Sequence, residues 1–304
     1  MIKYYKIESG KIAGCDLNTA DILMYISPDE AERKGLLDNY RLDEHTLNSA
    51  LDPDELARIE YEPDHRAVIF KSPKNYSGGE TFLFTVSSYG IFWFRDKLIV
   101  VMQEEMPLFE GKIFSRIAAL EDVFLGIIYR TIFHYLNHLK VINMISDSLE
   151  QKINTSMKNK YLINLFTLEK SLVYYLNAIN SNGFVIERLK QHAHKLAFSE
   201  ANIELLDDIT IENNQCYRQA EIYSNILAGL MDARVSIVSN NLNILMKTLN
   251  IITIAIMVPT FIVSAFSMNV KIPLSQYPWA FWAILGMAML SVLVFSMLWR
   301  WKRW

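Results

Sequence analysis

The sequence predicts an α+β domain followed by long α-helices and a two-helix transmembrane hairpin. Three observations lead to this fold class. Short β-branched and aromatic runs separated by turn residues extend to about residue 106. Residues 113–157 and 159–196 contain no proline and only two glycines, and apolar residues recur there at helical spacing. Two uncharged apolar runs lie near the C-terminus, where a soluble chain would not carry them.

The composition restricts the function classes. The 304-residue chain has a net charge of −3, so nucleic acid is not an expected partner. Cys15 and Cys216 are isolated in sequence, which indicates inert thiols of a reducing compartment rather than a disulfide framework or a zinc knuckle. The start of the chain has no apolar core of signal-peptide type, so we expect the N-terminus to stay in the cytoplasm.

Residues 1–110 are expected to form a cytoplasmic α/β domain. Strands are predicted at DILMYIS, HRAVIFK, TFLFTVSS, IFWFR and KLIVVMQ, with hairpin turns at SYGI and RDK. Prolines and acidic first turns between Ser27 and Glu60 predict short helices. The pair Gly78–Gly79 lacks the lysine and the following helix of a phosphate-binding loop, so no nucleotide is predicted to bind.

Helices account for the next part of the chain. Residues 111–200 are predicted to form a helical hairpin, and residues 201–248 the cytoplasmic part of a stalk helix. The pattern of that stalk runs on as a single helix from about Asn202 to Ser267, a length of roughly 100 Å. Because a bilayer core is only about 30 Å thick, most of this helix would project into the cytoplasm.

Two transmembrane helices are predicted, at 249–267 and 279–299, joined by a short extracytoplasmic loop at 268–278. Buried core helices are the alternative, but uncharged apolar runs of this length favour a membrane. The basic tail at 300–304 contrasts with a loop whose only charge is Lys271. The excess of positive charge therefore predicts a multi-pass cell-membrane protein with both termini in the cytoplasm.

Polar side chains of the first predicted span share one face. They recur at steps of three and four residues, which makes a narrow heptad stripe. Its members, with one methionine, are Asn250, Thr253, Met257, Thr260, Ser264 and Ser267. Polar groups in hydrocarbon are costly unless they face partners or water, so the stripe favours a wet lumen ringed by several copies of this helix. The alternative is that the hydroxyls bond back to carbonyls of their own helix or join neighbouring helices.

The stripe continues toward the cytoplasm. It passes through Met246, Asn243, Ser239, Ser236 and Asp232, and five heptads before Asn243 it reaches Asp208. A ring of Asp232 copies would concentrate cations at the inner end of a pore. An ordinary solvated helix charge is the alternative for this aspartate.

The stripe also predicts the class of ion. Its membrane part contains no carboxylate, cysteine or histidine that could replace the hydration shell of a hard dication. Amides and hydroxyls would instead bond to the water that Mg²⁺ gives up reluctantly, which disfavours zinc handling by soft ligands. A dication that crosses inward gains about 4.6 kcal/mol per 100 mV of membrane potential, so no ATPase is needed. We recognise no nucleophile–base pair, so an enzyme is not predicted, nor is a resident cofactor.

The stretch EIYSNILAGLMDARVSIVSNNLNILMKTLNIITIAIMVPTFIVSAFSMN, from Glu221 to Asn269, resembles the stalk and first membrane helix of the CorA-type magnesium transporters. The hallmark of that family is Gly-Met-Asn after the helix, where this chain has Ser-Met-Asn. The segment DEHTLNSALDPDELARIEYEPDHRAVIFK also looks like the family's N-terminal domain. The resemblance implies a funnel-shaped homopentamer, an inward pore for Mg²⁺, and closure when cytoplasmic Mg²⁺ binds between subunits.

The resemblance also implies roles for individual residues. The outer mouth and ion selectivity would belong to Ser267, Met268 and Asn269. Pore-lining positions would be Ser264, Thr260, Met257, Thr253, Asn250, Leu249, Met246 and Asn243, with the constriction at Leu249 and Met246. Asp232 would sit on the axis nearer the cytoplasm, and Asp208 would be half of a regulatory metal site.

Three features depart from the family's pattern. Ser267 replaces the glycine of the motif, and the outer loop has no acidic residue. Asn48–Ser49 stands where the regulatory acidic partner is expected, with Asp52, Asp54 and Glu55 nearby.

Two rival functions stay open. One is a transporter of Zn²⁺, Co²⁺ or Ni²⁺ from the same family, or one that runs outward. His192 and His194 face nearly opposite ways on a helix and would not chelate a metal together. The other is a membrane-anchored sensor or scaffold that passes no ion.

Overall fold

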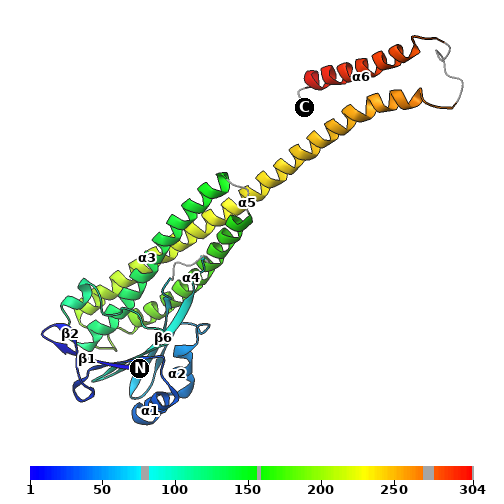
Figure 1. Ribbon diagram of the computed structural model, residues 1–304. Coiled ribbons are helices and arrows are strands. Elements are labelled where there is room, and N and C mark those ends of the chain that lie inside the picture. Colours follow the sequence, from blue (N-terminus) through cyan, green and yellow to red (C-terminus); the bar gives the residue numbers. More distant parts are fainter. Residues whose placement is uncertain (77–81, 156–158, 270–276, 303–304) are drawn as a thin grey trace. The chain divides into compact units, whose positions relative to one another are not determined.

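The structure is a computed structural model that describes residues 1–76, 82–155, 159–269 and 277–302. The chain divides into two compact units, Met1–Met231 and Asp232–Trp304. Helix α5 contributes to both units (Figure 1).

A seven-stranded sheet forms the base of the first unit, in the order β2-β1-β3-β7-β6-β5-β4. The strands β3 and β7 pair in parallel, and all the other neighbours are antiparallel. The strands are β1 Ile2–Glu8, β2 Lys11–Gly14, β3 Ile22–Ile26, β4 Arg58–Tyr61, β5 His65–Pro73, β6 Val86–Phe94 and β7 Leu98–Met102. This mixed sheet, followed by long helices, confirms the α+β class.

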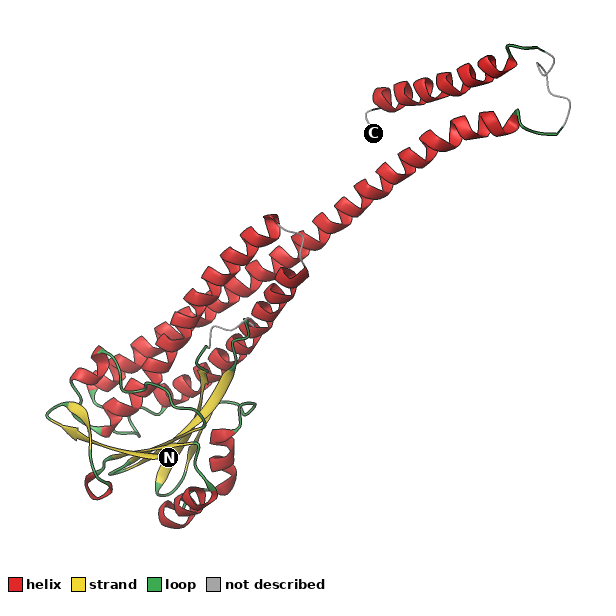
Figure 2. Ribbon diagram, in the orientation of Figure 1, coloured by secondary structure: helices red, strands yellow, loops and turns green. Residues whose placement is uncertain are grey.

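Two short helices cover one face of the sheet, α1 Glu30–Tyr40 and α2 Glu44–Leu51 (Figure 2). Asp29 caps α1 by accepting a hydrogen bond from the Glu32 N–H, and Asp43 caps α2 in the same way. Leu36 and Leu47 pack from these helices onto alternate strand residues such as Phe92. The short helices expected between Ser27 and Glu60 are therefore confirmed.

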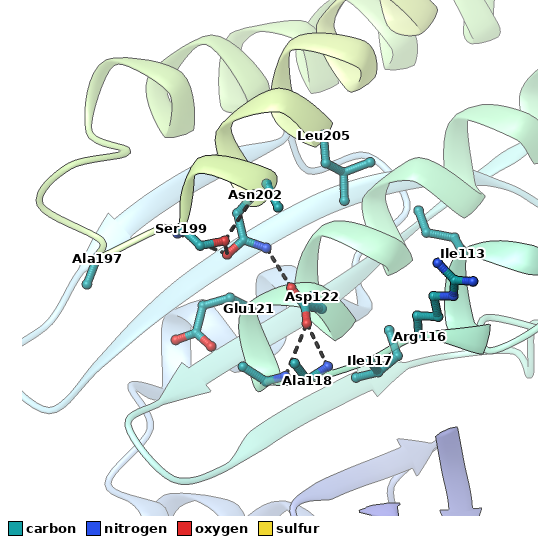
Figure 3. Close-up of a pocket in the computed structure, with 12 residues that line it drawn as sticks. Ile113, Arg116, Ile117, Ala118, Glu121, Asp122, Ala197, Ser199, Asn202 and Leu205 are labelled. Atoms are coloured by element: carbon teal, nitrogen blue, oxygen red, sulfur yellow. Dashed lines mark hydrogen bonds between the residues drawn. The ribbon is translucent and has the colours of Figure 1, made fainter. Parts of the chain in front are cut away.

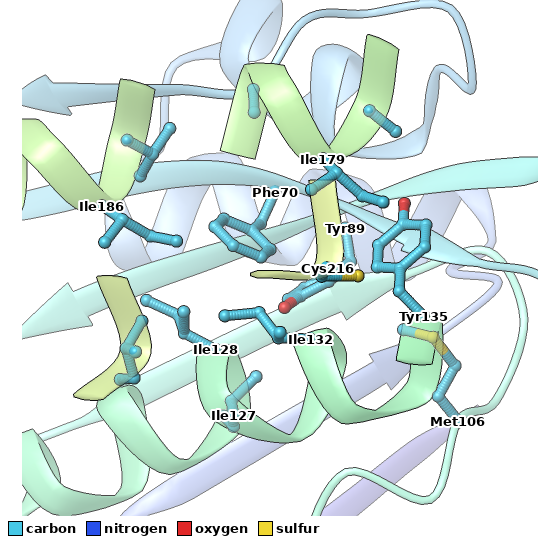
Figure 4. Close-up of a cluster of buried hydrophobic side chains, with 14 of the residues drawn as sticks. Phe70, Tyr89, Met106, Ile127, Ile128, Ile132, Tyr135, Ile179, Ile186 and Cys216 are labelled. Carbon is cyan, nitrogen blue, oxygen red and sulfur yellow. The ribbon is translucent and has the colours of Figure 1, made fainter. Parts of the chain in front are cut away.

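The opposite face of the sheet is covered by α3 Leu120–Thr155, α4 Asn159–Gln191 and the N-terminal part of α5 Glu200–Ala265 (Figures 2 and 4). Phe70 and Tyr89 from the sheet meet Tyr135 of α3, Ile179 of α4 and Cys216 of α5, and all five are at most 1% exposed. Burying side chains of this size contributes about 1.5–3 kcal/mol each. Burial also raises the pKa of the Cys216 thiol to about 12, which agrees with the inert thiol that we expected.

The prediction of a hairpin turn at SYGI was wrong. Strand β6 runs through it without a break. A Cβ atom added to Gly90 would lie 2.6 Å from the Cβ of Ala50, so the glycine allows α2 to approach the sheet closely. The RDK turn is confirmed, with the Phe94 N–H donating to the Lys97 carbonyl at 2.9 Å.

Other boundaries also differ from those we expected. Strands β1, β2 and β4 were not predicted. The first long helix begins at Leu120 rather than at residue 113, because residues 112–115 form a 3₁₀ turn and Asp122 binds the N–H groups of Ala118 and Ala119. The second long helix ends at Gln191 rather than at residue 196.

The predicted long single helix is confirmed by α5, which has 66 residues and contains Pro259. Proline has no N–H, so the carbonyl of Ala255 loses its helical partner there. The second unit is completed by α6 Ala280–Lys302, which returns alongside the C-terminal part of α5 (Figure 1).

Candidate ion pathway

Two of the described helices, α5 and α6, are long and apolar enough to cross a membrane. None of the most apolar stretch of α5 is buried, and only 6% of that of α6 is. The core helices that we considered as the alternative would be buried by their own chain. The exposure of this apolar surface therefore favours two spans.

The polar stripe lies on the exposed side of α5. The side chains of Asn250, Thr253, Met257, Thr260 and Ser264 are all exposed. The less exposed positions between residues 251 and 262 are Ile251, Ala255, Pro259 and Ile262. At about 100° of rotation per residue, the two sets lie on roughly opposite sides of the helix.

Helix α6 is the other described helix of the Asp232–Trp304 unit, and it runs alongside the C-terminal part of α5 (Figure 1). The polar stripe lies on a side of α5 that is exposed within a single chain. In a single copy the stripe would face lipid.

The threonine hydroxyls of the stripe bond back to their own helix. Thr253 Oγ1 donates to the Leu249 carbonyl at 2.9 Å, and Thr260 Oγ1 donates to the Ile256 carbonyl at 2.7 Å. This is the alternative that we considered for individual hydroxyls, and it applies to both threonines. Each hydroxyl donates its proton to a carbonyl of its own helix. The lone pairs of the hydroxyl oxygen can therefore still accept hydrogen bonds from groups on the stripe side of the helix.

Helix α5 ends at Ala265, and Ser-Met-Asn begins at Ser267, after Phe266. The N–H and the hydroxyl of Ser267 both donate to the Ser264 carbonyl, at 3.1 and 2.9 Å. Ser267, Met268 and Asn269 are exposed. Most of the predicted outer loop, including Lys271, lies outside the described residues.

The inner part of the stripe is exposed as well. Asn243, Met246 and Leu249 have exposed side chains, and Ser236 Oγ donates to the carbonyl of Asp232 at 3.1 Å. Asp208 is exposed on α5 in the first unit. Across the described ranges, no group of three or more His, Cys, Asp or Glu side chains is placed to hold a metal ion. The role of Asp208 in a regulatory metal site stays a prediction.

The region of Asn48–Ser49 contains paired charges that we did not predict. Arg58 Nη1 donates to Glu55 at 2.6 Å, and its Nη2 donates to the Ser49 hydroxyl at 3.1 Å. Arg58 Nε also donates to Glu60 at 2.5 Å. The carboxylate of Glu55 is thus already neutralised by a resident cation, and it is less suited to replace a metal-binding aspartate.

Lys71 lies beneath the same loop and was also missed. Its Nζ donates to the carbonyls of Pro53 and Glu55, at 2.5 and 2.6 Å, and to the Ser88 hydroxyl at 3.1 Å. Burial lowers the pKa of the Lys71 ammonium, and the nearby carboxylates, of which Asp54 acts most, oppose that shift. The only sequence signal for this residue is a lysine that ends the apolar run HRAVIFK.

A pocket of about 600 Å³ lies where α3 and α5 begin (Figure 3). Asp122 accepts from the Ala118 and Ala119 N–H groups at 2.8 and 3.1 Å, and from Asn202 Nδ2 at 2.6 Å. Asn202 also bonds to Ser199, just before α5. These contacts cap two helix starts, so we assign the pocket a structural role.

Comparisons with known proteins agree with the two apolar helices and the resemblance described above. A family model described as "CorA-like Mg2+ transporter protein" matches residues 18–303. The cobalt/magnesium transport protein CorA of Methanocaldococcus jannaschii is 23% identical over 269 residues, which cover 85% of this chain and 83% of that protein.

Solved structures show a similar fold. The complete structure of the CorA magnesium transporter from Methanocaldococcus jannaschii aligns with a TM-score of 0.83 at 20% identity, over 98% of this chain and 96% of that one. The full-length CmaX protein aligns with a TM-score of 0.73 at 16% identity, over 100% of this chain and 98% of that one.

Proposed function

This chain belongs to the CorA-like Mg²⁺ transporter family, and on that premise we propose that it conducts hydrated Mg²⁺ into the cell through a homopentameric pore. Membership in the family makes it a divalent-cation transporter rather than an enzyme. Mg²⁺ as the cargo, five copies and inward flow are our proposal. The membrane potential would drive the ion, by about 4.6 kcal/mol per 100 mV.

The observation that carries the proposal is the uncovered polar stripe of α5. Thr253, Thr260 and Ser264 are exposed and sit on the side of the helix away from the less exposed Ala255 and Pro259. Exposing these groups to hydrocarbon is unfavourable, so copies of α5 are expected to face one another around a water-filled axis.

The hydrogen bonding of the threonines supports a cation that keeps its water. Water molecules bound to Mg²⁺ direct their protons outward, so a compatible wall must accept hydrogen bonds. Thr253 and Thr260 donate into their own helix and leave acceptor lone pairs on the pore side. A naked ion would instead need carboxylates, which the stripe lacks between residues 243 and 267.

Self-association has its own support just before the membrane. Val235, Val238, Leu242, Leu245 and Ile252 follow a heptad pattern beside the polar stripe and are all exposed. Val235 and Leu245 are 68% and 65% exposed. Apolar side chains in this pattern normally pack against another helix, and a second copy of α5 supplies one. The polar stripe lies next to these apolar positions on the helix surface. This arrangement suits a ring of helices that pack through the apolar positions and turn the polar stripe toward a water-filled axis.

Co²⁺ is a second candidate cargo, because the name of the Methanocaldococcus jannaschii relative includes cobalt. Both ions are octahedral dications with tightly held water, so a wall of neutral acceptors would discriminate weakly between them. Regulation by Mg²⁺ at Asp208 stays a prediction, and the pairing of Glu55 with Arg58 disfavours Glu55 as the second metal ligand.

Purified protein in liposomes that contain a Mg²⁺-sensitive dye would test the proposal. An inside-negative potassium diffusion potential should drive Mg²⁺ entry, and Asn269→Ala should abolish it. A sensor or scaffold would give the same trace as empty liposomes. Zn²⁺ entry without Mg²⁺ entry would refute the choice of cargo.

A further inference from the structure

The end of α5 has an unusual hydrogen-bond arrangement at one carbonyl. The Ser264 oxygen accepts the Ser267 N–H at 3.1 Å and the Ser267 hydroxyl at 2.9 Å. A carbonyl oxygen has two lone pairs, and two donors from one residue occupy both. This carbonyl is one of the four at the end of a helix that lack an intrahelical partner.

The direction of that carbonyl matters. Helix carbonyls point toward the C-terminal end, which is the negative end of the macrodipole. On the proposed topology this end of α5 is the outer mouth of the pore. A free carbonyl there would attract the water of an arriving dication, and Ser267 occupies it instead.

Backbone geometry does not explain a small residue at position 267. Among the described residues, the non-glycine positions with positive φ are Ser9, Ser27, Arg41 and Ala197. The turn at Ser267 thus uses a conformation open to any residue. What the serine adds is its hydroxyl, a donor that neither glycine nor alanine has.

We propose that Ser267 is a positioning residue that weakens capture of hydrated cations at the outer mouth, because its hydroxyl withdraws the Ser264 carbonyl from contact with them. This inference rests on the proposed function and adds a determinant of apparent affinity. With that carbonyl occupied, fewer acceptors at the end of α5 are open to an arriving ion, and among the described residues the exposed amide of Asn269 is one that remains. The chain therefore gives up affinity at the mouth and releases ions into the pore more readily.

Initial rates of Mg²⁺ entry into liposomes, measured against Mg²⁺ concentration, test the proposal. Ser267→Ala frees one lone pair per subunit, so the KM should fall by about 2–10-fold, the range of one net hydrogen bond. Ser267→Gly should behave like Ser267→Ala, and Ser267→Thr, which keeps the hydroxyl, should match the original protein. A role limited to capping the helix would lower the maximal rate of Ser267→Ala and leave the KM unchanged.

Binding gives a second readout that does not need conduction. Hexaamminecobalt(III) is an inert octahedral cation with outward-pointing protons, similar in shape to hydrated Mg²⁺. Its affinity for the full-length protein in detergent should rise in Ser267→Ala and not in Ser267→Thr. Gel-filtration profiles identical to that of the original protein would show that the variants keep their assembly.

The outcomes separate the two proposals. Tighter binding in Ser267→Ala without any Mg²⁺ entry would overturn conduction and support the role of Ser267. Normal entry with the same KM and the same binding in all variants would overturn the role of Ser267 and leave conduction standing. Absence of both entry and binding in the original protein would overturn both.

Discussion

The carboxamide of Asn182 on α4 binds both backbone groups of Lys71 on β5. Its Oδ1 accepts the Lys71 N–H at 2.9 Å, and its Nδ2 donates to the Lys71 carbonyl at 2.8 Å. Strand β4 pairs with β5 only as far as Ile69, so the side chain replaces a strand partner at this point. The same helix reaches the loop before β4 through Ser181 Oγ, which accepts the Ala57 N–H at 2.8 Å. Helix α4 is thereby bonded to the sheet as well as packed on it.

Asn182→Ala should lower the free energy of unfolding by about 2–5 kcal/mol, because two buried backbone groups lose their partners. Thermal unfolding followed by circular dichroism would measure the change. Asn180→Ala, at an exposed position of the same helix, is the matched control and should change little. Equal stability of the two variants would contradict the role of Asn182.

Thr260→Val should slow Mg²⁺ entry by about 2–10-fold, since each subunit loses one acceptor on the stripe. Thr248→Val is a close control. Thr248 Oγ1 donates to its own helix at 2.9 Å, as Thr260 Oγ1 does at 2.7 Å, but Thr248 lies off the stripe. The liposome assay would give the Mg²⁺ entry rate of each variant. Equal slowing in both variants would mean that the lost hydrogen bond to the helix carbonyl causes the effect, rather than the loss of an acceptor on the stripe.

Gly90→Ala should destabilise the first unit by about 1–3 kcal/mol, because the new methyl group would meet Ala50 at 2.6 Å. Adding Ala50→Gly should restore most of the loss. Gly14→Ala, where a Cβ meets nothing within 4 Å, serves as the control. Denaturant unfolding would compare the variants, and a stable Gly90→Ala protein would refute the close approach of α2.

Stability should fall in acid because of His138. Its Nδ1 lies 2.7 Å from the Tyr175 hydroxyl, and burial, with a smaller effect of His134, lowers the pKa of His138 to about 4. An unfolded histidine has a pKa of about 6.5, so between these values the unfolded chain binds the extra proton. The stabilisation is complete above about pH 6.5 and is lost progressively as the pH falls to about 4, by up to about 3 kcal/mol.

Unfolding measured across this pH range would test the assignment. His138→Phe should flatten the slope between about pH 4 and 6.5. His194→Gln, at an exposed position, should keep the slope of the original protein. An unchanged slope in His138→Phe would assign the acid sensitivity to another group.

The sequence was most informative where one periodicity ran over many residues. The 66-residue helix was predicted to within two residues at each end, because nothing around Gly229 or Pro259 provides a turn. The sequence-based prediction was wrong where a residue type that usually marks a turn was instead required by a contact between distant parts of the chain. Gly90 reads as a turn residue until Ala50, forty residues earlier, is known to lie against it.

The charged groups near Ser49 were missed for a related reason. Arg58 is only three residues from Glu55, but no local pattern in the sequence marks the two as a pair. Lys71 looks like an ordinary strand residue, and the fold brings it to the carbonyl of Glu55, sixteen residues earlier. The roles of the stripe residues are a different case. One chain shows which side of α5 is uncovered, whereas a pore exists only between copies.

The unbroken course of α5 makes residue count as important as residue identity. One amino acid inserted between Asp232 and Asn243 would leave every stripe side chain from Asn243 to Ser264 unaltered yet turn that whole set by about 100° relative to the preceding part of the helix. Seven inserted amino acids would bring the set back to within about 20° of its original direction. Evolution along this segment should therefore tolerate substitutions far more readily than single-residue gaps.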